Sequence, residues 1–362
     1  MEQREIACRG CLLGLAVGDA MGYTVDTKSW AEICEDYGPN GLLGYDLANG
    51  YAEITSYTQL AAFSCNSLLL GITRGNQEKY VNYLAMGLRE WLKGQQYRGL
   101  EEKTHCWLVH TPEMRRRHPM DTRILDALSR ENLGTPERPI FKSENPGSIT
   151  VPIAVGLLYD KAWMSPAMVG VLGTYGVAFT HGNPESFLAG AVLAYIIAGI
   201  VQHPDKPLAR QFAQAVEAVQ MQFGQTYPET QKVADLIGRA MELSKDAELS
   251  ALAVMSMLGC TTAAECLAGA VYACMIHPAN FDEAIIAAVN HSGRSAAVGA
   301  ITGAILGAKL GADVLPDFYL ECLEPVQVLE ELASDVAKGR QVMQLFDDTW
   351  DQKYMQGRPV GK

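Results

Sequence analysis

The feature that most constrains the fold is an unbroken apolar run of 15 residues, from Phe187 to Val201. It follows Asn183, Pro184 and Glu185, which is the order typical of a helix N-terminus: a capping residue, proline at the first helical position and an early acid. A membrane-spanning helix needs about 20 apolar residues, so this run is too short to cross a bilayer. We therefore predict a helix that is buried on all sides inside a protein core.

Helical signals also dominate the rest of the chain. Thr262 with Glu265, and Asn280 with Glu283, have the spacing of a capping box ahead of further helices. The segment 294–310 is rich in Gly and Ala, which allows neighbouring helices to approach closely. Because no alternating strand pattern and no βαβ rhythm occurs, the sequence predicts an all-α fold. Amphipathic patterns of period 3.6 cover Gln77 to Trp91, Pro207 to Phe223 and Glu229 to Leu243.

Three irregular stretches, 37–54, 101–119 and 133–149, carry Gly, Pro and Asn. None is of low complexity and none separates regions of different composition, so they are loops rather than linkers. No internal repeat is present. The prediction is one compact domain over residues 1–362.

Charge and cysteine usage exclude several classes of partner. The net charge of -12 argues against a nucleic-acid or anionic-membrane surface, which would need clustered Lys and Arg. The nine cysteines form no paired framework, and the one CxxC, at Cys8 and Cys11, has no second pair to complete a zinc site. The first ten residues do not have the form of a signal peptide. We expect a cytoplasmic protein with buried, reduced thiols.

Four segments carry distinctive motifs: GDAMG in 10–26, TSYTQ in 54–69, THGNP in 179–198 and NHSGRSA in 288–308. In this order along nearly the whole chain, they resemble the ADP-ribosylglycohydrolase family. GCLLGLAVGDAMGYTVD (10–26) is similar to the family's opening helix, its GDALG-type turn and an acidic metal ligand, and we expect Asp19 there to be a turn and cap residue. ITSYTQLAAFSCNSLL (54–69) resembles the family's T-D-D-T-Q helix entry, and FTHGNPESFLAGAVLAYIIA (179–198) its T-H-G-x-P entry. AVNHSGRSAAVGAITGAILGA (288–308) resembles the second metal loop. The resemblance implies the family's compact helical fold.

The resemblance also implies a hydrolase with two Mg²⁺ ions, held by a Thr-Asp-Asp triplet, an upstream acid and two Asp of the later loop. Carried over residue by residue, Asp26 occupies the position of the upstream acid and Thr55 that of the triplet's Thr. Ser56 and Tyr57 stand where the triplet has two Asp.

The later loop departs from the family pattern in the same way. Arg294 and Ala296 stand where two Asp belong, and Ala297 replaces the hydroxyl residue after them. Four carboxylates are missing and one cation is added. Because a pair of hard cations needs several anionic oxygen ligands, we predict no metal ligand and no bound cofactor.

The family's glycine-rich loop, which wraps a diphosphate with backbone N–H groups, corresponds here to the segment 142–160. It keeps Ser143 and Gly147, whereas Val151 stands where the family has Arg. A weaker cradle on Gly147 and Ser148 is the expectation. The segment 117–128 keeps only Thr122 and the helix pattern of its counterpart.

The predicted site follows from these positions. The ligand-binding residues are predicted to be Thr55, Ser56, Tyr57, Gly147, Ser148, His181, Gly293, Arg294 and Ser295, with Asp26 as the candidate catalytic acid. His181 has an alternative structural role at a helix entry. Tyr57 either stacks on a base or ribose or fills the void left by the metals. Arg294 either reaches solvent or lies in the pocket, where it pairs with Asp26 or with a phosphate or ribose-linked anion of a ligand.

Three functions remain open at this point. The first is a pseudoenzyme that binds ADP-ribose, a related nucleotide or an ADP-ribosylated partner. The second is a metal-independent ADP-ribosyl hydrolase or other glycosyl-transfer enzyme, with Asp26 or Glu53 as general base. The third is a scaffold whose pocket is closed by Tyr57 and Arg294. We favour the first.

Overall fold

The computed structural model describes residues 2–47, 50–96, 103–118, 120–339 and 347–360. Over these ranges the chain forms helices and no strand, apart from one isolated bridge between Ala52 and Leu323. The predicted all-α class is confirmed. The α-helices are α1 (Glu2–Val25), α2 (Trp30–Tyr37), α3 (Ser56–Thr73), α4 (Tyr80–Gln96), α5 (Thr122–Ser129), α6 (Val151–Leu158), α7 (Pro166–Ala178), α8 (Pro184–Gln202), α9 (Leu208–Phe223), α10 (Glu229–Leu243), α11 (Ala251–Leu258), α12 (Ala263–Ile276), α13 (Phe281–Val289), α14 (Ser295–Leu310), α15 (Asp317–Cys322), α16 (Val326–Lys338) and α17 (Asp348–Tyr354). Short 3-10 turns are η1 (Gln77–Lys79), η2 (Trp107–His110), η3 (Glu113–Arg115) and η4 (Ala312–Val314).

The predicted core helix is α8, which is long and apolar enough to span a membrane by composition but is 78% buried inside the protein over its most apolar window. Asn183 caps it by accepting a hydrogen bond from the backbone N–H of Glu185 at 2.8 Å. Thr262 and Glu265 form the predicted capping box on α12. The predicted helix at 77–91 is wrong at its start, because η1 precedes α4.

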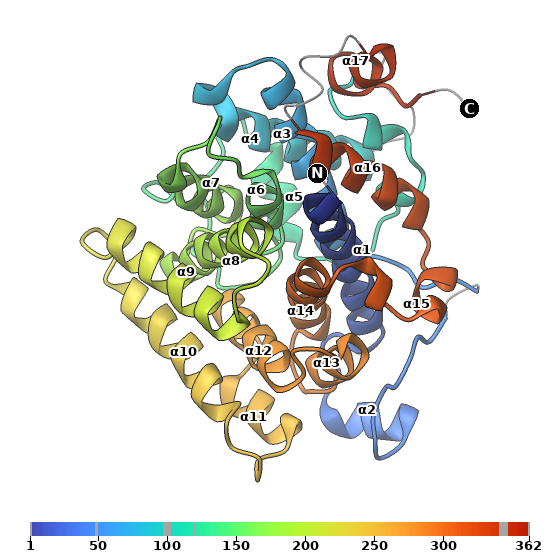
Figure 1. Ribbon diagram of the computed structural model, residues 1–362, viewed down its shortest axis with the longest axis vertical. Coiled ribbons are helices and arrows are strands. Elements are labelled where there is room, and N and C mark those ends of the chain that lie inside the picture. The colour runs from blue at the N-terminus through green and yellow to red at the C-terminus, as the bar shows by residue number, and fades with distance from the viewer. Residues whose placement is uncertain (1, 48–49, 97–102, 119, 340–346, 361–362) are drawn as a thin grey trace.

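The centre of the molecule is an antiparallel pair, α1 and α14, which lie side by side in Figure 1. Four small-residue positions on each helix meet in register, from Gly10 against Gly307 to Gly22 against Ser295. A Cβ atom added at Gly18 would lie 1.9 Å from the backbone oxygen of Gly299. The two backbones therefore touch, and this contact brings the end of α1 next to the start of α14.

The same stretch of α1 corrects a prediction. Asp19 was expected in a turn, but α1 continues unbroken to Val25, because its glycines face α14 instead of breaking the helix. The fully buried Asp19 carboxylate accepts four hydrogen bonds of 2.6–3.0 Å, from the backbone N–H and hydroxyl groups of Thr55 and Thr58. Burial raises the pKa of Asp19 to about 6, against these hydrogen bonds. Asp19 therefore does cap a helix, but the helix is α3.

The nine cysteines are all free thiols, and seven of them are buried. Cys34 and Cys322 are half-buried. Burial raises the pKa of Cys8 to about 11, so this thiol is an unreactive part of the core at neutral pH. The predicted packing role is confirmed for both residues of the CxxC.

Candidate functional site

A cavity of about 520 Å³ lies where α1 ends and where α3, α5 and α14 begin. It is within the size range of small-molecule sites. The loop before α6 completes its wall. The lining residues are Tyr23, Asp26, Thr27, Thr55, Ser56, Tyr57, Met120, Asp121, Thr122, Arg123, Asn145, Gly147, Arg294 and Ala296.

Most of the predicted site lines this cavity, although its residues come from distant parts of the sequence. Asp26 follows α1, the helix that packs on α14, and Arg294 stands at the N-cap position of α14. The α1–α14 contact therefore places these two residues together. The predicted residues in the lining are Asp26, Thr55, Ser56, Tyr57, Gly147 and Arg294.

Four predicted ligand-binding residues do not line the cavity. Ser148 and His181 are buried behind it, with Ser148 Oγ 3.0 Å from His181 Nδ1. The Ser295 hydroxyl donates to the backbone oxygen of His291 at 3.4 Å. The Gly293 carbonyl accepts from the backbone N–H of Thr27 at 3.0 Å. The polar groups named here make their hydrogen bonds within the protein. For His181 this favours the alternative of a structural role.

Arg294 and Asp26 form an ion pair, which was one of the alternatives predicted for Arg294. Nη2 of Arg294 lies 3.4 Å from Oδ2 of Asp26, and both side chains are largely buried. The other carboxylate oxygen of Asp26 accepts from the backbone N–H of Ala296 at 3.2 Å. Burial raises the pKa of Asp26, and the Arg294 guanidinium opposes that rise. The candidate catalytic acid is thus already bound on both oxygens.

Tyr57 lies beside this pair and is only 4% exposed. Burial raises its pKa well above the usual range, and the adjacent Arg294 guanidinium acts in the opposite direction. In the described part of the chain, neither the Tyr57 hydroxyl nor Nε of Arg294 has a hydrogen-bond partner of good geometry. The burial of the ring favours the alternative in which Tyr57 fills the void left by the metals. Two neighbouring donors, the Tyr57 hydroxyl and Nε of Arg294, are left without an acceptor.

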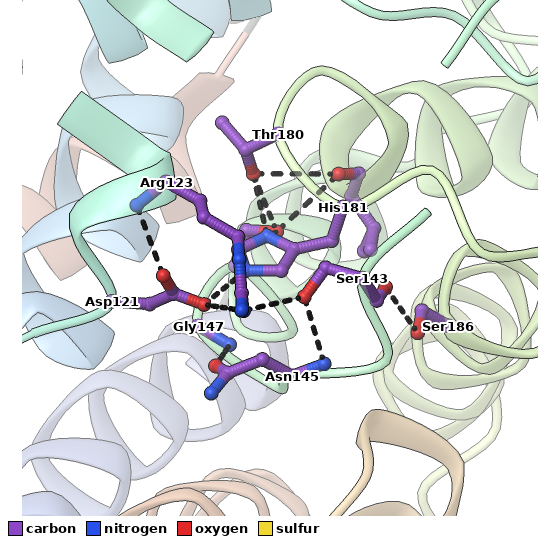
Figure 2. Close-up of polar contacts among 10 residues, drawn as sticks. Asp121, Arg123, Ser143, Asn145, Gly147, Thr180, His181 and Ser186 are labelled. Carbon is purple, nitrogen blue, oxygen red and sulfur yellow. Dashed lines mark hydrogen bonds and ion pairs between the residues drawn. The ribbon is translucent and has the colours of Figure 1, made fainter. Parts of the chain in front are cut away.

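Figure 2 shows a second polar cluster, which was not predicted from the sequence. Asp121 caps α5 by accepting from the backbone N–H of Arg123 at 2.9 Å, and it also pairs with Nη1 of Arg123 at 3.0 Å. On its other side, Oδ2 of Asp121 lies 3.4 Å from Nε2 of His181. Burial raises the pKa of Asp121, but the hydrogen bonds from His181 and Arg123 outweigh burial and lower it to about 2. The order Asp121-Thr122 ahead of an apolar helix is an N-cap signal that the sequence did offer.

Arg123 also connects this cluster to the glycine loop. Its Nη1 lies 3.2 Å from the Ser143 hydroxyl. The Gly147 backbone N–H donates to Oδ1 of Asn145 at 2.9 Å, so the predicted backbone cradle has one of its donors occupied. A neighbouring cavity of about 360 Å³ shares Arg123 and Asn145 with the main one. The side chain of Arg123 is 51% exposed and is thus an accessible cation on this wall.

The donor set does not fit a metal pair. Among the residues that the structure describes, no three His, Cys, Asp or Glu side chains lie close enough together to hold a metal ion. Glu53, the alternative general base, is absent from the cavity lining and pairs with Arg116 at 3.0 Å and with His118 at 3.7 Å. The cavity instead offers two carboxylate–guanidinium pairs.

Known proteins resemble this chain both in sequence, through a family model, and in structure. A family model described as ADP-ribosylglycohydrolase matches residues 2–345. No curated protein matches the sequence. A solved structure titled "ADP-ribosylglycohydrolase-related protein complex" is similar to this chain with a TM-score of 0.57 and 20% sequence identity, over 94% of this chain and 100% of that chain. At this identity the structural match establishes the fold alone, whereas the family match includes every residue of the cavity lining.

Proposed function

Because the chain belongs to the ADP-ribosylglycohydrolase family, we propose that its cavity binds ADP-ribose, a related nucleotide or an ADP-ribosylated partner without two-metal hydrolysis. The observation that carries this proposal is the Asp26–Arg294 ion pair, formed at positions where the family pattern has metal ligands. The free thiols support a reducing compartment, and we propose the cytoplasm.

The electrostatics of the cavity support binding without metals. Of the positions that hold metal-binding carboxylates in the family pattern, only that of Asp26 still carries one, and a guanidinium lies within ion-pair distance of it. A divalent ion there would face a fixed positive charge and too few anionic oxygens. Arg123, next to the Gly147 loop, supplies a cation for a ligand's diphosphate without any metal.

We expect the melting temperature to be the same in EDTA and in millimolar Mg²⁺. An ion that binds only the folded state stabilises the protein, so a bound metal pair would raise the melting temperature when metal is added. Thermal melting by calorimetry, with Ca²⁺ and Mn²⁺ as further additions, tests this. A rise on adding Mg²⁺ that EDTA reverses would contradict the metal-free proposal.

Calorimetric titration with ADP-ribose in EDTA should show binding that Arg123→Ala weakens by about tenfold or more, because a charge-assisted contact contributes about 1.5–3 kcal/mol. Arg9→Ala is the matched control. Arg9 is a half-buried arginine paired with Glu330 at 2.8 Å, outside the cavity, and its loss should leave the affinity unchanged.

The alternatives are separated by two outcomes. Multiple-turnover release of ADP-ribose from an ADP-ribosylated peptide in EDTA, abolished by Asp26→Ala, would favour the metal-free enzyme. No binding of ADP-ribose at any concentration tested would favour the scaffold. We expect neither, because Asp26 is bound on both oxygens and the cavity is open to a ligand.

A further inference from the structure

One corner of the cavity has hydrogen-bond donors without acceptors. The Arg294 guanidinium lies against the Tyr57 oxygen, but among the described residues neither the Tyr57 O–H nor Nε of Arg294 finds an acceptor of good geometry, and both atoms are buried. Buried polar groups of this kind are rare in folded proteins, because leaving a donor without a partner costs about 1–3 kcal/mol. Both residues line the cavity, so a ligand atom can supply the missing acceptor. We call this pair the Tyr57–Arg294 corner.

The corner favours an anionic acceptor. Nε belongs to a guanidinium, and the corner stands at the first turn of α14, a 16-residue helix whose N-terminus attracts negative charge. Asp26 offsets the guanidinium charge through Nη2 at 3.4 Å and accepts from the Ala296 N–H, but it leaves Nε of Arg294 without an acceptor. The net charge of -12 would repel anions in general, so a local cation with an unused donor is a specific feature.

The cavity has a second cation that is separate from this corner. Arg123 is held by Asp121 and Ser143, whereas Arg294 pairs with Asp26, and the two arginines share no partner among the described contacts. The diphosphate of ADP-ribose is one compact group, and in the proposed function it lies at Arg123. With the diphosphate assigned to Arg123, the donors of the corner are left to another part of the ligand.

We infer that the Tyr57–Arg294 corner is an anion subsite, and that the ligand is an ADP-ribosyl compound with a phosphate monoester on one of its riboses in addition to the diphosphate. The inference rests on the proposed function for the ADP-ribosyl part. The phosphate oxygen accepts from the Tyr57 hydroxyl and from Nε of Arg294, which satisfies both donors at once. A phosphate on the distal ribose and a phosphate on the adenosine ribose would offer the same acceptor oxygens to the corner.

The experiment compares affinities in EDTA for three probes: ADP-ribose, ADP-ribose 1″-phosphate and ADP-ribose 2′-phosphate. One of the two phosphorylated probes should bind the wild-type protein at least about tenfold more tightly than ADP-ribose. Which of them does so identifies the ribose. Tyr57→Phe should reduce that preference by about threefold to tenfold, and Arg294→Ala should abolish it.

The controls distinguish a loss of ligand binding from a loss of folding stability. Tyr57→Phe removes a hydroxyl without a partner, so its melting temperature should not fall. Arg123→Ala should weaken all three probes by a similar factor. Equal affinities for all three probes, or a preference that survives Arg294→Ala, would overturn the subsite while leaving the proposed function standing.

If none of the probes binds, the proposed function fails and inorganic phosphate decides the subsite. A phosphate-induced rise in melting temperature that Tyr57→Phe reduces would support it. No rise in millimolar phosphate would overturn it.

Discussion

Replacing Gly18 by alanine should destabilise the protein by more than about 4 kcal/mol, a range that single substitutions rarely reach. The new Cβ would lie 1.9 Å from the backbone oxygen of Gly299, so α1 and α14 would have to separate along their whole contact. No flexible side chain is available to move aside. Urea denaturation of the variant, or failure to obtain soluble protein, gives the measurement.

The same chemical change at Gly238 is the matched control. Gly238 lies inside α10, and a Cβ atom there would meet nothing within 4 Å. Because alanine has the higher helix propensity, Gly238→Ala should raise the free energy of unfolding by about 0.5–1 kcal/mol. Equal effects of the two substitutions would show that the α1–α14 contact is not as close as described.

Replacing Asp19 by alanine should cost about 3–5 kcal/mol, because it leaves four buried donors of Thr55 and Thr58 without an acceptor. Asp19→Asn retains one acceptor oxygen and should cost clearly less. Since Thr55 begins α3 and lines the cavity, Asp19→Ala should also weaken ADP-ribose binding. Chemical denaturation and titration of both variants check this. A loss of stability below about 1 kcal/mol in Asp19→Ala would contradict the capping role.

The fold was predictable wherever the signal is local. The cap at Asn183 and the apolar run behind it determine α8, and the period of 229–243 gives the bounds of α10. The stretch around Asp19 was not predictable in this way. Glycine inside a helix and glycine in a turn look alike in sequence, and only the facing backbone of α14 decides between them.

In the candidate site, too, the residues that belong to sequence motifs were predictable and the others were not. Motif positions placed Asp26, Tyr57 and Arg294 in one pocket, because each stands at the end of a helix whose order along the chain the motifs show. Asp121 and Arg123 were missed, since their place in the cavity depends on the path of loops with no periodic pattern. Ser148 and His181, predicted to bind the ligand, lie outside the cavity lining and contact each other, and no sequence pattern indicates that contact.

The pairing of α1 with α14 also determines the order in which this protein can be made. α1 is synthesised before α14, and its side chains, such as Leu13 and Leu15, are fully buried in the folded protein. Its partner surface, from Ser295 to Gly307, is separated from it by the helices α2 to α13 and is synthesised much later. Until α14 is available, the apolar face of α1 has no partner to pack against. Contacts of such long sequence separation also form slowly. The core around α1 can therefore close only after α14 has been synthesised, and we expect chaperones to bind the nascent chain before that point.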